Sequence, residues 1–224
     1  MRHLILPTAT EALIVRGQFD FRYSDGALWA TEAWERYRNV GSDVETVRTE
    51  RRSEAGTLRG HALLSPTGIE RLRLQWESAD GRRSNISLTA LDGSWLLNEN
   101  GTHREWPTAP QGGLLLPVTA LVQVALPFPL AREGAQLAEL LVISRPSPDA
   151  PWQLATTRAR FEPLPLRHVD WRGTALRLKG WQWGAWGHPT QSAWFDRNGN
   201  CLAFQCHTAQ RPWRAMLTSR MSFA

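Results

Sequence analysis

Residues 69–77 alternate between apolar and charged or polar side chains, and this alternation constrains the fold more than any other feature of the chain. Leu72, Leu74 and Trp76 occupy one set of positions, whereas Arg71 and Arg73 occupy the other. Successive side chains of a β-strand point to opposite faces of a sheet. The segment is therefore predicted to be a strand with one apolar face and one face in water.

Short turn signals separate this segment from further runs of the same kind. Glycine after aspartate or asparagine readily takes the left-handed backbone conformation that two-residue hairpin turns need. Regularly spaced turns of this type predict a meander of antiparallel strands. The turn signals are Asp80-Gly81, Asp92-Gly93, Asn100-Gly101 and, near the C-terminus, residues 196–200.

Three segments are less regular. Residues 13–21 favour a strand, and residues 27–38 fit either a short helix or a continuing strand, because their aromatic residues satisfy both spacings. Residues 114–126 carry apolar side chains at helical spacing and precede Pro127 and Pro129, which cannot continue a helix. We expect a short apolar helix there, capping or plugging the sheet.

These elements predict a mainly β fold with an antiparallel sheet, an apolar concave surface and one or two short helices. The chain of 224 residues is long enough to bury a substantial core. We expect a single β domain over residues 1–224. An alternative division has two β meanders, at about 44–106 and 138–221, joined by the apolar helix near 114–126.

Twelve tryptophans are the most informative feature of the composition. Trp181 and Trp183 share one face of an expected strand, and Trp186 follows in a glycine-containing segment. One interpretation is an aromatic wall for an acyl chain or a sugar ring, with arginines at its mouth. The other is a tryptophan-rich core. The predicted ligand-binding residues are Trp181, Trp183, Trp186, Trp76, Arg71 and Arg73.

The order of several segments resembles a bacterial family. Residues 93–101 (Gly-Ser-Trp-Leu-Leu-Asn-Glu-Asn-Gly) follow a hairpin, and a Pro/Gly linker leads to residues 114–121 (Leu-Leu-Leu-Pro-Val-Thr-Ala-Leu). Next come residues 160–169 (Arg-Phe-Glu-Pro-Leu-Pro-Leu-Arg-His-Val) and 194–199 (Trp-Phe-Asp-Arg-Asn-Gly). In order and spacing, residues 57–220 resemble the bacterial proteins labelled glycolipid-binding.

That resemblance implies a long, strongly curved antiparallel sheet rolled into a partial barrel. The implied fold is similar to that of periplasmic lipoprotein carriers and of a small pigment-biosynthesis enzyme. The chain departs from the family in two places. The family's acidic, alternating segment before the Leu-Pro helix is replaced by residues 106–113, and His168-Val169 stands where the family has a tyrosine.

No catalytic, metal or cofactor site is predicted. The sequence has no phosphate-binding loop, no dinucleotide-binding glycine motif and no nucleophile elbow. His168, His188 and His207 lack the spacing of metal ligands. An enzyme acting on a hydrophobic molecule would need a polar group inside the cavity, and Glu162 and His168 are the candidates. Cys201 and Cys206 are expected to be buried free thiols.

The chain carries a net charge of +5 and has a pI near 10.2. We expect a non-catalytic binder of a lipid, glycolipid or other amphipathic ligand. The alternatives are a nucleic-acid or protein-partner scaffold that uses the basic surface, or a small-molecule enzyme. No run of apolar residues is long enough for a transmembrane helix, so we expect a cytoplasmic protein. The tryptophans could equally form a homodimer interface.

Overall fold

The structure, a computed structural model, is built from β-strands. It describes residues 1–66, 68–107, 114–115, 136–144, 150, 152–185, 189–207 and 211–223. The strands are β1 (Glu11–Tyr23), β2 (Leu28–Asn39), β3 (Glu45–Ser53), β4 (Gly56–Ser65), β5 (Gly68–Ser78), β6 (Arg83–Ala90), β7 (Trp95–Glu99), β8 (Thr102–Trp106), β9 (Leu114–Leu115), β10 (Gln136–Ser144), β11 (Gln153–Trp171), β12 (Thr174–Ala185), β13 (Thr190–Phe195), β14 (Cys201–His207) and β15 (Trp213–Ser222).

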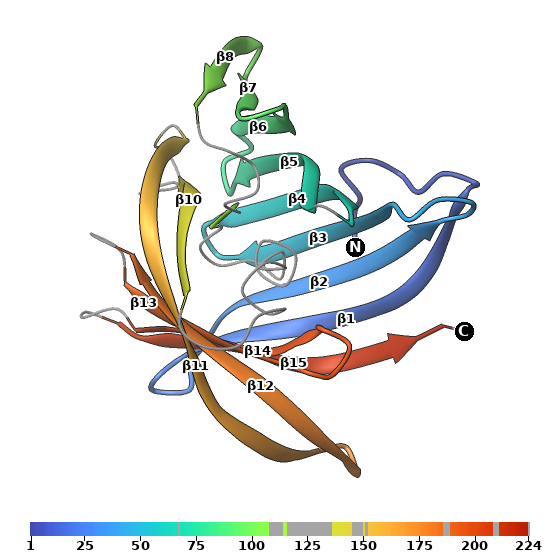
Figure 1. Cartoon of the computed structure of the whole chain (residues 1–224), viewed down its shortest axis with the longest axis vertical. Helices are drawn as coiled ribbons and strands as arrows, with labels where there is room; N and C mark the ends of the chain where they lie inside the picture. The colour runs from blue at the N-terminus through green and yellow to red at the C-terminus, as the bar shows by residue number, and fades with distance from the viewer. Residues whose placement is uncertain are drawn as a thin grey trace.

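All of these strands belong to one sheet of 15 strands (Figure 1). Neighbours in the sheet are neighbours in the chain, except that the first strand, β1, pairs with the last, β15. Every pairing is antiparallel apart from the short parallel pair β9–β10. The two expected meanders are therefore parts of one continuous sheet, which the β1–β15 pair holds together.

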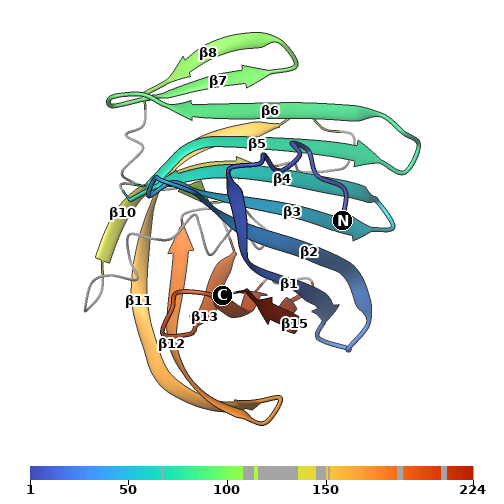
Figure 2. The same ribbon diagram turned by 90° about the vertical axis from the view of Figure 1, so that its right-hand side faces the viewer.

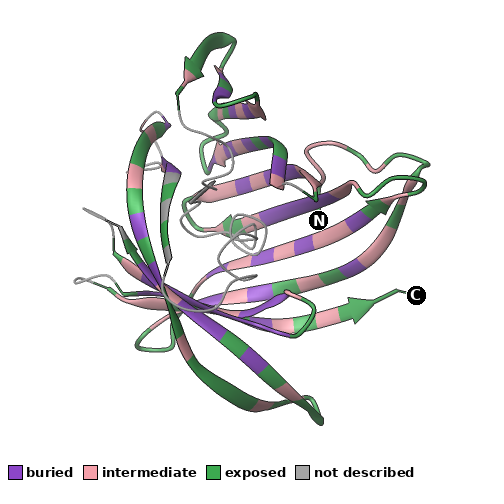
Figure 3. Ribbon diagram, in the orientation of Figure 1, coloured by how far each residue is buried: buried purple, intermediate pink, exposed green. Residues whose placement is uncertain are grey.

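The alternation predicted for residues 69–77 is confirmed in β5. Leu72, Leu74 and Trp76 are buried, whereas Arg71 and Arg73 are exposed. The predicted hairpin turns also form. At Asn100 and Gly101, φ is 48° and 94°, and this pair of positive angles suits the right-handed twist of the flanking strands. Figure 3 shows the same alternation of buried and less buried residues along β1 and β2.

The expected short helices are not found among the described residues. Residues 27–38 fall in strand β2, where Ala30, Glu32 and Trp34 are buried at every second position. The sequence alone could not distinguish a strand from a helix here, because the aromatic residues of this short segment fit the spacing of either structure. Leu114 and Leu115, expected to begin the apolar helix, form strand β9, and residues 116–126 lie outside the described residues. No described helix is long and apolar enough to cross a membrane.

The sheet is strongly curled (Figure 2), and hydrogen bonds involving side chains link β7 and β8, at one end of the sheet, to β11 and the residue before it. The indole N–H of Trp106 on β8 donates to the hydroxyl of Thr156 on β11, at 2.9 Å. The backbone N–H of Trp152 donates to Glu99 on β7, at 3.2 Å. Leu141 and Ile143 of β10 join the core formed by the inner faces of β3 to β7. Backbone pairing does not close the curl, so the sheet is a partial barrel.

The outer face of β3 is also covered. The segment before β1 crosses it, and the buried Arg48 donates to the carbonyl of Ile5 at 2.9 Å and to Glu11 at 2.7 Å. Arg48 also lies over the ring of Tyr37, with its guanidinium carbon 4.6 Å from the ring centroid. Residues 46–50 are consequently buried on both faces, although their sequence mixes charges with apolar side chains.

Candidate functional site

The predicted ligand-binding tryptophans lie in two different cores. Trp181 and Trp183 on β12 are 4% and 1% exposed and belong to the core formed with β1, β2 and β13 to β15. Trp76 on β5 is 7% exposed and belongs to the core of β3 to β7. Trp186 lies outside the described residues. The structure thus brings Trp181 and Trp183 together and separates them from Trp76.

Arg71 and Arg73 do not border an aromatic wall in the described structure. Both are exposed on β5, on the face opposite to Leu72, Leu74 and Trp76. A head group held by these arginines would lie outside the curl, away from Trp181 and Trp183. The ligand-binding role expected for these arginines stays a prediction that the geometry does not favour.

A continuous row of aromatic rings crosses the inner face of the sheet. Its ring centroids are spaced by 5.8 Å between Phe161 and Trp183, 6.0 Å between Trp183 and Phe204, and 5.2 Å between Phe204 and Trp213. Trp213 then contacts both Phe21 and Trp29, each at 5.7 Å, and Trp29 stacks on Tyr23 at 5.9 Å. We call these seven residues, Phe161, Trp183, Phe204, Trp213, Phe21, Trp29 and Tyr23, the aromatic row.

The aromatic row is deeply buried at one end and partly open at the other. Phe161 and Trp183 are fully covered, whereas Tyr23, Trp29 and Trp213 are half-buried. A pocket of about 280 Å³ adjoins the open end, where Trp213 forms part of its wall. The remaining lining residues are Ser24, Gln205, Cys206, His207, Pro212 and Arg214.

Charged side chains lie beside the aromatic row at its half-buried end. The guanidinium carbon of Arg211 lies 3.4 Å from the ring centroid of Tyr23, and Arg211 also pairs with Asp25 at 3.4 Å. Deeper inside, the guanidinium carbon of Arg51 lies 5.6 Å from the ring centroid of Trp29. Burial lowers the pKa of Arg51, and the charge of the buried Glu32 opposes this shift. The opposite charges of Arg51 and Glu32 therefore lie among the aromatic rings of the interior.

Several buried indole N–H groups have no hydrogen-bond acceptor among the described residues. They include those of Trp34, Trp181 and Trp183, which face the interior. Most buried donors in proteins are paired, and an unpaired one costs about 1–3 kcal/mol. The buried face of the sheet therefore contains indole N–H groups without a protein acceptor beside its apolar side chains.

The two candidate catalytic groups, Glu162 and His168, lie outside the interior. His168 is exposed on β11, and Glu162 is half-exposed and pairs with Arg160 at 2.9 Å. Burial raises the pKa of the free thiols, to about 12 for Cys201 and about 11 for Cys206. Neither thiol is poised as a nucleophile. Within the described part of the chain, no group of three potential metal-binding side chains occurs.

Sequence reasoning missed most of the aromatic row. Tyr23, Trp29, Phe204 and Trp213 come from four strands, and only the pairing of β1 with β15 places them side by side. The predicted strand alternation assigned Trp181 and Trp183 to one face correctly. It carried no signal for which distant strand would lie beside them.

Comparison with known proteins identifies the fold. No family model matches the chain, and no curated protein matches it. A solved structure from Brucella abortus, described as a β-barrel-like protein of a domain of unknown function (DUF1849), superposes with a TM-score of 0.65. It is 9% identical in sequence, and the alignment covers 94% of this chain and 98% of that one.

A second solved structure is less similar. A DUF1089 family protein from Pseudomonas aeruginosa gives a TM-score of 0.44 at 12% identity, over 90% of this chain and 92% of that one. Membership of a glycolipid-binding family is not shown by these comparisons. The superposition with the Brucella protein shows that this chain has a β-barrel-like fold, and its one long, curved antiparallel sheet forms a partial barrel.

Proposed function

We propose that this protein binds an amphipathic small molecule, such as a lipid or glycolipid, and performs no chemistry on it. The aromatic row carries the proposal. It forms a continuous layer of aromatic rings across β11, β12, β14, β15, β1 and β2, and only its half-buried end, at Trp213, Trp29 and Tyr23, adjoins a pocket. The apolar part of the ligand contacts Trp213 and Trp29, and its polar part lies toward Arg211 and Arg214.

The alternative of a nucleic-acid scaffold is less well supported, because much of the positive charge is neutralised within the protein. Paired guanidinium groups contribute little to the long-range field that attracts a polyanion. The enzymatic alternative is weakened by the outward position of Glu162 and His168. The paired arginines include Arg36 and Arg38 with Glu45, Arg48 with Glu11, Arg59 with Glu50 and Glu77, Arg82 with Asp80, and Arg220 with Asp196.

The first test is native mass spectrometry of freshly purified protein, before and after lipid extraction. The proposal expects a lipid-sized mass that extraction removes. Binding of dodecyl maltoside to the extracted protein, measured by calorimetry below the micelle concentration, then gives an affinity. Trp213→Ala should weaken this affinity by about tenfold or more, because a buried aromatic contact is worth about 1.5–3 kcal/mol.

Trp171→Ala is the matched control. Trp171 is also a half-buried tryptophan, but it lies outside the aromatic row, and its indole donates to the carbonyl of Leu217 at 3.4 Å. Its substitution should leave dodecyl maltoside binding within about twofold of the unsubstituted protein, a change below the worth of one aromatic contact. Equal losses in both variants, or no binding by the extracted unsubstituted protein, would refute the proposal.

A further inference from the structure

The hairpin formed by β11 and β12 extends beyond the other strands of the sheet. Its outer part, residues 165–179, reaches past them at the lower end of Figures 1 and 2, and we call it the outer hairpin. Backbone pairing between the two strands continues as far as the turn at the tip. The outer hairpin is therefore an ordered projection that a large partner can reach.

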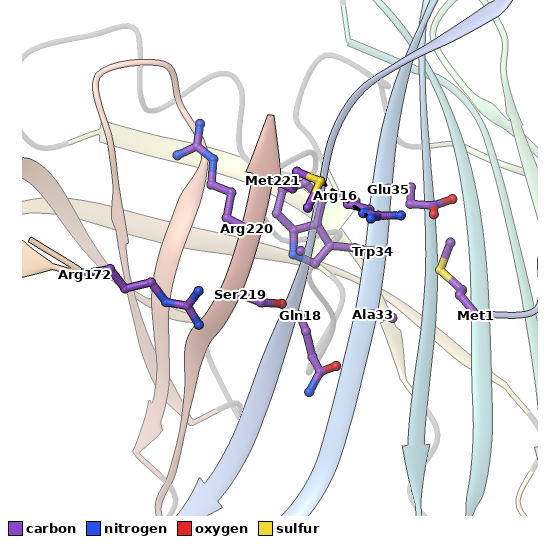
Figure 4. Close-up of a pocket in the computed structure, with 11 residues that line it drawn as sticks. Met1, Arg16, Gln18, Ala33, Trp34, Glu35, Arg172, Ser219, Arg220 and Met221 are labelled. Atoms are coloured by element: carbon purple, nitrogen blue, oxygen red, sulfur yellow. Dashed lines mark hydrogen bonds between the residues drawn. The ribbon is translucent and has the colours of Figure 1, made fainter. Parts of the chain in front are cut away.

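One face of the outer hairpin is held against the rest of the sheet. Leu178 is buried in the core formed with β1, β2 and β13 to β15, and Leu176 packs against that core. In the turn at the tip, Arg172 extends toward Ser219 of β15 (Figure 4) and donates to the carbonyl of Thr218. Successive side chains of a strand point to opposite faces, so the other face of the outer hairpin is the one available to a partner.

Positive charge is concentrated in the outer hairpin. It has four cationic side chains and one carboxylate, Asp170, so its net charge is +3, whereas the whole chain of 224 residues carries +5. In the part of the chain that the structure describes, none of the four forms an ion pair with a carboxylate. Their field therefore extends into the solvent and attracts an anionic partner. The four cations are Arg167, Arg172, Arg177 and Lys179.

Arg177 and Lys179 form a cationic stripe on the available face of β12. Both are exposed, and they alternate with the buried Leu178 along the strand. The exposed His168 lies directly opposite Arg177 in the register of β11 with β12. Arg167 lies opposite Leu178 in that register and so belongs to the other face. The stripe thus places two unpaired cations side by side on an outward surface.

An exposed apolar side chain lies beside the stripe. Pro165 and Leu166 of β11 together oppose the single residue Lys179, which is the arrangement of a β-bulge. Leu166 is 45% exposed. Asp170, the carboxylate of the outer hairpin, accepts the backbone N–H of Gly173 at 2.8 Å. Unpaired cations beside an exposed leucine suit the interface of an anionic bilayer, where cations meet lipid phosphates and apolar groups insert among the acyl chains.

We propose that the outer hairpin docks this protein on the surface of an anionic phospholipid membrane, through Arg177, Lys179 and Leu166. A nucleic acid would also attract the cations, but it would leave Leu166 in water, so the exposed leucine favours the lipid surface. The inference goes beyond the proposed function, because docking does not require a ligand in the interior. A membrane partner would nevertheless bring a binder of amphiphiles to the source of its ligand.

The test measures co-sedimentation of the protein with vesicles made from equal parts of phosphatidylcholine and phosphatidylglycerol. Binding should fall at high salt, because salt screens exposed charges. Vesicles of phosphatidylcholine alone should bind at least about tenfold more weakly, since they lack the anionic surface. Arg177→Gln with Lys179→Gln should weaken binding to the mixed vesicles by about tenfold or more. Leu166→Ser should weaken it by about threefold or more, through the lost apolar contact.

Arg82→Gln with Arg83→Gln is the charge-matched control. These arginines are 66% and 62% exposed at the side chain and lie in the β5–β6 turn and at the start of β6, outside the outer hairpin. Their removal lowers the net charge equally. An equal loss of vesicle binding in this control, no loss in the Arg177 and Lys179 variant, or no binding by the unsubstituted protein would overturn the inference. Binding of a DNA duplex that requires Arg177 and Lys179, without vesicle binding, would assign the stripe to a nucleic acid instead.

Dodecyl maltoside separates this inference from the proposed function. The Arg177 and Lys179 variant should bind it within about twofold of the unsubstituted protein, because the stripe lies outside the interior. Should the unsubstituted protein bind the mixed vesicles but not dodecyl maltoside, the proposed function falls and the docking surface stands. Should it bind dodecyl maltoside but not the vesicles, the docking surface falls and the proposed function stands.

Discussion

Trp106 donates its indole N–H to the hydroxyl of Thr156, 2.9 Å away, and so joins the end strand β8 to β11 across a gap that backbone pairing leaves open. The two residues are 50 positions apart in the sequence. A flexible connection of that length costs closure entropy, which the contacts along the seam must offset. The shape of the interior therefore depends on a few side-chain contacts at this seam.

The first prediction concerns this contact. Trp106→Phe and Thr156→Val should each lower the free energy of unfolding by about 1 kcal/mol, the net worth of one hydrogen bond. The double variant should lose less than the sum of the two. Urea unfolding of all three variants measures the coupling. Thr157→Val, on the opposite face of β11, is the control, and a coupling energy of zero would show that the seam is held by other contacts.

The second prediction concerns the close packing at Gly17. A Cβ atom at this position would lie 2.8 Å from the carbonyl oxygen of Ser219 and 2.9 Å from the indole of Trp34. Gly17→Ala should therefore cost about 1–3 kcal/mol of stability through overpacking. Gly184→Ala is the control, because a Cβ there meets only the hydroxyl of Thr190 at 3.7 Å. Equal thermal midpoints for the two variants would contradict the expected clash.

The third prediction concerns pH. Burial, followed by the charge of Arg48, lowers the pKa of His61 to about 4 from an ordinary value of 6.5. The unfolded chain therefore takes up this proton at a higher pH than the folded protein does. Stability should be full above pH 6.5 and fall as the pH drops toward 4, by up to about 3 kcal/mol.

Urea unfolding between pH 7.5 and 4 on the His61→Gln variant checks this reasoning, since glutamine cannot titrate. The variant should lose most of the slope that the unsubstituted protein shows between about pH 6.5 and 4. His103→Gln serves as the control, because His103 is exposed on β8. A slope that survives in the His61 variant would assign the titration to other groups.

The fourth prediction concerns the buried ion pair on the outer face. Arg48 and Glu11 are 2% and 5% exposed at the side chain, and their closest atoms are 2.7 Å apart. Burial disfavours the charged form of Glu11, but hydrogen bonds led by that from Arg48 outweigh it and lower the pKa of Glu11 to about 2.

Arg48→Met leaves the Glu11 carboxylate buried without its partner, so stability at pH 7 should fall by about 3–5 kcal/mol. Arg52→Met is the control, because Arg52 also pairs with a carboxylate, Glu50, but is 62% exposed. That substitution should cost less than about 1 kcal/mol. A similar small cost for Arg48→Met would mean that Glu11 finds another partner.

The local structure of this protein was largely readable from its sequence. The alternation of Leu72, Leu74 and Trp76 with Arg71 and Arg73 specified strand β5 and the face that is buried. Asn100-Gly101 specified a tight hairpin turn, because both positions require a positive φ. Such signals are local, since each depends only on a residue and its near neighbours.

The tertiary structure decided which strands and segments pack against each face of the sheet. The pairing of β1 with β15 placed Trp213 beside Trp29, and the segment before β1 buried Arg48. Alternation gives the residues that share a face, but not the strand that lies beside them or the segment that covers them. The sequence by itself therefore determined an antiparallel sheet with an apolar face. Only the long-range pairing and the curl of the sheet determined which aromatic and arginine side chains could form a site.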